Sequence, residues 1–103
     1  MIRTARVVSG YRRAQRLLAS DVGPLGVRAL LALDELMGVR ETDLPSGELQ
    51  ERHRGVALRL MAFDGRPADL ELLHAEIDAL ARDMDRSRRV AGGAGLGAST
   101  QRR

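Results

Sequence analysis

Apolar side chains recur along most of the chain at the three- and four-residue spacing of an α-helix. In the first part of the chain this spacing predicts a helix over residues 2–19, whose apolar stripe is Val7, Val8, Tyr11, Ala14 and Leu18. The opposite side of this helix is basic, because four arginines fall within about 120° of one another at about 100° per residue. They are Arg6, Arg12, Arg13 and Arg16. We expect the stripe to face the core and the arginines to face solvent or a partner.

The segment from Pro24 to Gly38 is apolar on more than one side. Proline suits the first position of a helix and glycine suits a left-handed cap at its end, so the pattern predicts a second helix between them. Its broad apolar arc is Leu25, Ala29, Leu30, Ala32, Leu33, Leu36 and Met37. Val27 and Leu31 fall on the other side. A helix with two apolar sides needs two neighbours. It is therefore either the central helix of the domain or a helix that contacts another subunit through Val27 and Leu31.

Two further helices are expected to form an antiparallel hairpin. Asp43 or Ser46 can cap the third helix, which ends at Gly65, and Pro67 starts the fourth, which we expect to end near Val90. The third helix has the stripe Leu49, His53, Val56, Leu60 and Phe63, and the fourth has Leu70, Leu73, Ile77, Leu80 and Met84. Facing stripes of this kind pack at a small crossing angle. The sequence thus predicts an all-α bundle of about four helices.

The last residues, 92–103, differ from the rest in their glycine and alanine content. Gly92 and Gly97 have the spacing of a phosphate-binding loop, but such a loop follows a strand, opens a helix and carries a lysine where this chain has Ala98. We therefore interpret residues 92–103 as a flexible basic tail, and residues 1–91 as one helical domain.

Composition narrows the class of protein. The 103 residues include only two aromatic side chains and no cysteine, so the core must be built from aliphatic residues, without disulfides or thiolate metal ligands. A core with so little area favours self-association, and we expect a homo-oligomer. No apolar stretch approaches the length of a membrane span, and the expected location is the cytoplasm.

Charge is distributed unevenly. Residues 1–20 carry a net charge of +5, residues 21–80 carry −6 and residues 81–103 carry +4. The basic ends suit an anionic partner, either a nucleic-acid backbone or an acidic protein surface. The candidate binding residues are the four arginines of the first helix together with Arg88, Arg89, Arg102 and Arg103.

The sequence contains few candidate catalytic or metal-ligating residues. Glu71, His74 and Asp78 share one side of the fourth helix, but a dimetal bundle needs a second Glu-x-x-His and two more carboxylates, so no metal site is predicted. His53 lies within an apolar stripe, which favours a packed, hydrogen-bonded imidazole over a catalytic or pH-sensing one. No serine has the setting of a nucleophile. We therefore expect no catalytic residue, cofactor or small-molecule substrate.

Two hypotheses follow. The first is a non-catalytic, self-associating helical adaptor or assembly protein whose basic ends engage a protein or nucleic-acid partner. Its layout is similar to that of small helical proteins in regulatory complexes and in viral DNA-packaging machinery, although no motif identifies a family. The alternative is a nucleic-acid-binding protein that contacts the phosphate backbone through the arginines of the first helix.

Overall fold

A computed structural model of the chain describes residues 2–21 and 23–97, and every regular element in these residues is helical. The elements are α1 (Ile2–Ala19), α2 (Leu25–Met37), the short 3₁₀ helix η1 (Glu41–Asp43), α3 (Gly47–Met61) and α4 (Pro67–Gly97). The all-α, four-helix architecture predicted from the sequence is therefore confirmed.

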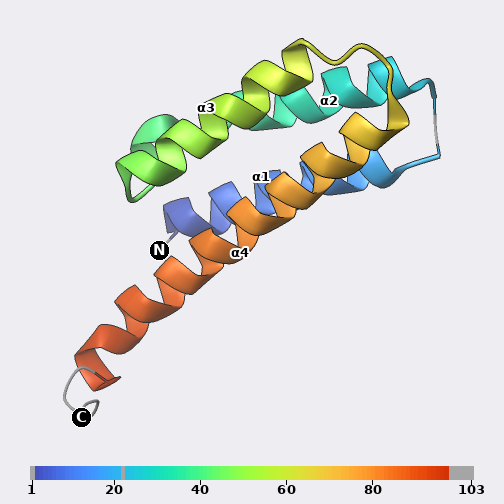
Figure 1. Cartoon of the computed structure of the whole chain (residues 1–103). Coiled ribbons are helices and arrows are strands. Elements are labelled where there is room, and N and C mark those ends of the chain that lie inside the picture. The colour runs from blue at the N-terminus through green and yellow to red at the C-terminus, as the bar shows by residue number, and fades with distance from the viewer. Residues whose placement is uncertain (1, 22, 98–103) are drawn as a thin grey trace.

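The four helices run alternately in opposite directions, so that each is antiparallel to the next (Figure 1). α1 packs extensively on both α4 and α2, and α3 completes the bundle by contacting α2 and α4. The expected hairpin of α3 and α4 is present, but these two helices share the smallest of the four neighbouring contacts. Because α1 and not α2 has the most extensive contacts, the interpretation of α2 as the central helix is wrong.

The core is formed where the predicted stripes meet. The largest side chains that are almost fully buried are Tyr11, Leu36, Ile77, Leu80, Met84, Val7 and Val56. α2 contributes mainly small buried residues, Ala29 and Ala32, which let it approach α1 closely. The aliphatic core expected from the composition is thus centred on α1 and α4.

The ends of α2 and α3 differ in detail from the predicted ones. Pro24 precedes the first helical residue, and its carbonyl accepts the first backbone hydrogen bonds of α2. Gly38 has a φ of −77° and so does not form a left-handed cap. Instead the helix ends in a tighter turn with an i→i−3 hydrogen bond, in which the Val39 N–H donates to the Leu36 carbonyl at 3.0 Å. α3 ends at Met61 rather than at Gly65, whose φ of +100° belongs to the turn that follows.

α4 is longer than the sequence pattern predicts. The helix continues past Val90 to Gly97, so the first six residues of the predicted tail are helical. No proline interrupts this segment, and its end projects beyond the other three helices (Figure 1). The apolar stripe stops earlier because α4 leaves the bundle there, not because the helix ends. Residues 98–103, which include Arg102 and Arg103, lie outside the described residues.

The start of α3 depends on a side-chain cap. The Ser46 Oγ accepts a hydrogen bond from the Leu49 N–H at 3.2 Å, as the sequence predicts for one of its two candidate caps. Ser46→Ala should lower the free energy of unfolding in urea by about 1 kcal/mol, because this N–H loses its partner. Ser46→Asp keeps an acceptor and should remain near wild type. Equal losses in both variants would contradict the role of the cap.

Candidate functional site

The four arginines predicted to form a basic face on α1 are not equivalent in the structure. Arg12 donates from Nη1 to Asp78 Oδ1 on α4 at 2.6 Å, and Arg13 donates from Nε to Glu35 Oε1 on α2 at 2.9 Å. Two of the four guanidinium groups therefore connect α1 to its two main neighbours. Within the described residues, Arg6 and Arg16 are exposed and form no ion pair.

Asp78 is the centre of a polar cluster between α1 and α4. Besides Arg12, its carboxylate accepts a hydrogen bond from Gln15 Nε2 at 3.2 Å and pairs with Arg82 at 2.9 Å. The hydrogen bond from Arg12 is the main cause that lowers the pKa of Asp78, and it outweighs the opposing effect of burial. Asp78 is therefore ionised and engaged by three donors.

The Glu71, His74 and Asp78 constellation does not come together as a ligand set. Glu71 and His74 line a hollow beside Leu18, whereas the Asp78 carboxylate is engaged by Arg12, Gln15 and Arg82. In the part of the chain that the structure describes, no three His, Asp or Glu side chains are placed to hold a metal ion.

Tyr11 and His53 form a buried polar pair in the core. Their exposed fractions are 0% and 4%, and 2.9 Å separates Tyr11 Oη from His53 Nδ1. The Leu36 backbone also acts on the imidazole, where it opposes the lowering of the His53 pKa. A neutral imidazole has one donor and one acceptor nitrogen, so the tautomer determines which member of the pair donates. This hydrogen bond joins α1 to α3.

Burial keeps both members of this pair neutral. It lowers the pKa of His53, against the opposing effects of Glu41 and of the Leu36 contact, and it raises the pKa of Tyr11, against the opposing charge of Arg52. Because neither side chain is accessible to a substrate, the pair acts in packing. The interpretation of His53 as a packed, hydrogen-bonded imidazole is confirmed.

Among the side chains that the structure describes, seven large apolar ones are exposed. They are Val27, Leu30, Leu31, Met37, Leu58, Met61 and Leu72. The predicted interface residues Val27 and Leu31 are 46% and 48% exposed. Leu30 and Met37, which the sequence pattern assigned to the buried arc, are 64% and 68% exposed, because α1 and α3 cover a narrower side of α2 than expected.

Four of these side chains lie on one side of α2. At about 100° per residue, Val27, Leu30, Leu31 and Met37 fall within about 120° of one another, with the exposed Asp34 among them. We call these five residues the α2 outer face. It is an unpartnered helix face with the spacing of an amphipathic helix.

α3 also exposes two large apolar side chains, Leu58 and Met61. Leu58, Met61 and Leu72 each lie outside the apolar stripe of their helix, so helical periodicity does not predict them as surface features.

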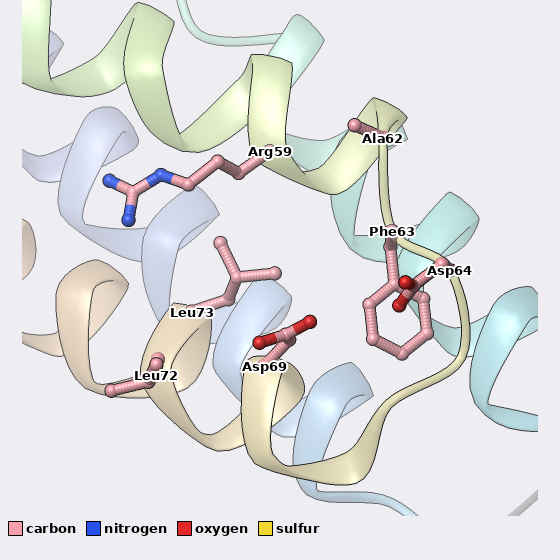
Figure 2. A pocket seen from close by; sticks show the side chains of 7 residues that line it. All are labelled: Arg59, Ala62, Phe63, Asp64, Asp69, Leu72 and Leu73. Atoms are coloured by element: carbon pink, nitrogen blue, oxygen red, sulfur yellow. The ribbon is translucent and has the colours of Figure 1, made fainter.

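A groove runs between α3 and α4, where the bundle is least tightly packed. Its first hollow, of about 220 Å³, is lined by Arg59, Ala62, Phe63, Asp64, Asp69, Leu72 and Leu73 (Figure 2). A second hollow, of about 260 Å³, is lined by Glu51, Arg52, Gly55, Val56, Arg59, Glu76, Ala79 and Leu80. Arg59 belongs to both hollows and pairs with Glu76 across the groove. We call the two hollows together the α3/α4 groove.

The start of α1 and the last part of α4 lie at one end of the described structure. α1 begins, and α4 leaves the bundle, on the same side (Figure 1). Arg6 is near the start of α1, and Arg88 and Arg89 belong to the last part of α4. Arg6 also lines a polar hollow of about 310 Å³ together with Arg40 and Asp43.

Comparison with known proteins finds no match to a family model, a curated protein or a solved structure. None of the described helices combines the length and apolar character needed to cross a membrane. The function is therefore inferred from the surfaces of this molecule.

The buried imidazole makes stability depend on pH. Because the folded state lowers the pKa of His53, the unfolded state binds the proton more readily, and acid favours unfolding. The free energy of unfolding should therefore fall as the pH is lowered from about 7 through about 6.5, the ordinary histidine pKa, toward the lower pKa of the folded state. Urea titrations between pH 5 and 8 measure this slope.

Two variants assign the slope to one side chain. His53→Gln keeps a donor and an acceptor for the buried pair and should flatten the profile between pH 5 and 7. His74→Gln removes the other histidine and should keep the wild-type slope. The assignment is wrong if His53→Gln and wild type lose stability in parallel.

Proposed function

We propose that this chain is a non-catalytic helical protein that self-associates through the α2 outer face, and whose basic ends bind an acidic or nucleic-acid partner. The observation that carries this proposal is the unpartnered apolar row on α2. Single exposed apolar residues are common on proteins, but a row of four on one helix side is typical of an interaction surface.

The chemistry of this row differs from that of the neighbouring surfaces. α1, α3 and α4 are connected by ion pairs, such as Arg12 with Asp78 and Arg52 with Asp83. The α2 outer face has no ion pair in the structure as described, and Asp34 is its one charged residue. Burial of apolar area is favourable at roughly 25 cal/mol per Å², so a partner that covers this row gains stability from it.

A non-catalytic role is supported by the partners of the buried and engaged polar side chains, which are structural. Tyr11 and His53 are buried against each other, and Asp78 is held by three donors. Among the described residues, these are the groups whose pKa values are shifted, and each has a structural partner. A reacting site needs such groups to converge on an accessible cleft.

Leu31→Glu tests the self-association. A charge in the middle of the α2 outer face should reduce the mass measured by light scattering to that of the monomer, because a buried carboxylate loses its hydration. Ala5→Glu, which introduces the same charge at an exposed position of α1, is the matched control and should keep the wild-type mass. A wild-type protein that stays monomeric at all concentrations would refute the proposal.

Nucleic-acid binding is the second candidate, and the placement of the basic ends favours it. Arg6 lies near the side on which the basic last part of α4 leaves the bundle, and Arg16 is exposed further along α1. Two arginines of the predicted footprint are less suitable, since Arg12 and Arg13 would have to leave Asp78 and Glu35. The footprint on α1 is therefore smaller than the sequence pattern suggests.

This second candidate is tested by reversing only the arginines without an internal partner. Arg6→Glu combined with Arg16→Glu should abolish a mobility shift with duplex DNA or RNA, and the logarithm of the wild-type affinity should fall steeply with the logarithm of salt concentration. Arg66→Glu is the control, because Arg66 is exposed at the turn between α3 and α4. Absence of any shift for the wild type at low salt would exclude this function.

A further inference from the structure

The α2 outer face needs a receiving surface, and the structure offers two: a second α2 outer face, or the α3/α4 groove. Resting on the proposed self-association, we infer that the α2 outer face of one copy binds in the α3/α4 groove of another copy. The contact is then head-to-tail, with different surfaces on its two sides.

The shapes of the two surfaces correspond. Val27, Leu30 and Leu31 have the spacing by which an amphipathic helix anchors itself in a groove. From Val27 to Met37 the row is about 15 Å long, at about 1.5 Å per residue. The α3 residues that line the groove extend from Glu51 to Arg59 for about 12 Å, and Ala62 and Phe63 line it beyond the end of the helix. The row and the groove are therefore of comparable length.

The groove has an apolar floor and room for side chains. Val56, Leu73 and Leu80 come from the core and line its hollows, and Figure 2 shows Leu73 pointing from α4 toward α3. Gly55 borders the second hollow, and a Cβ atom built there meets nothing within 4 Å. Leu72, on the α4 side of the groove, is 62% exposed and is placed to pack against an incoming helix.

Charge distinguishes the groove from a second α2 outer face. Asp34 lies within the row, and the five residues of a second row offer it no basic partner. The arginines that line the hollow beside Asp34, Arg6 and Arg13, belong to α1. The groove instead presents Arg59 at the point where its hollows join, and Arg52 further along. A guanidinium has five N–H donors, so Arg59 can keep Glu76 and still receive Asp34 of the incoming helix.

The α2 outer face of one copy cannot bind in the α3/α4 groove of the same copy. The α2 outer face points away from the core, and α3 lies between α2 and the groove that it forms with α4. Each head-to-tail contact therefore leaves one α2 outer face and one groove unoccupied. Such contacts extend an assembly until it closes into a ring or continues as a filament.

A mixing experiment tests this arrangement. Leu31→Glu blocks the α2 outer face, and Leu72→Glu blocks the groove, so each variant alone should sediment as a monomer where wild type forms larger species. In an equimolar mixture, the Leu72→Glu copy supplies an intact helix face and the Leu31→Glu copy an intact groove. Sedimentation velocity should then show a one-to-one dimer and no larger species, with Ala5→Glu assembling like wild type.

The outcomes separate the inference from the proposed function. If Leu31→Glu lowers the mass but the mixture stays monomeric, or if Leu72→Glu assembles like wild type, the groove is not the receiving surface and self-association stands. If Leu31→Glu does not change the wild-type mass, the proposed function itself fails. Circular dichroism melting establishes that each variant is folded, and Val27→Glu replaces Leu31→Glu if that variant is not.

Discussion

Tyr11 and His53 meet in the core of the bundle, and their hydrogen bond constrains how α1 and α3 face each other. Tyr11 comes from α1 and His53 from α3, both side chains are buried, and 2.9 Å separates Tyr11 Oη from His53 Nδ1. A buried polar group is costly unless it is paired, so each of these two groups is restricted to a narrow range of positions. The aliphatic side chains around them are non-directional and impose no comparable restriction.

Arginine performs two different tasks in this protein. Arg12 and Arg13 hold α1 against α4 and α2, so they belong to the architecture although they looked like a binding face. Arg6 and Arg16 share that face of α1 but are free of ion pairs in the described structure. Position on a helix wheel does not separate the two groups. The separation depends on where the acids of α2 and α4 lie after folding.

Periodicity was sufficient to predict the helices and most of the core, because the stripes of α1, α3 and α4 are the buried residues of those helices. Periodicity predicted the wrong end for α4, because this helix continues to Gly97 after its apolar stripe has ended. It also assigned Leu30 and Met37 to the core. The width of a buried face depends on how close the neighbouring helices come, and a single helix does not encode that distance. The groove was unpredictable for the same reason, since it arises from two helices that pack incompletely.

The uneven contacts around the bundle have an energetic consequence. α1 shares extensive contacts with two helices, whereas α3 is joined to α4 by a smaller contact that leaves the groove between them. Free energies of local opening follow the number and burial of the contacts that must be broken. We therefore expect the amide hydrogens of α3 to exchange with solvent before those of α1. The groove that we propose as the receiving surface is thus bordered by the helix that shares the smaller contacts with its neighbours.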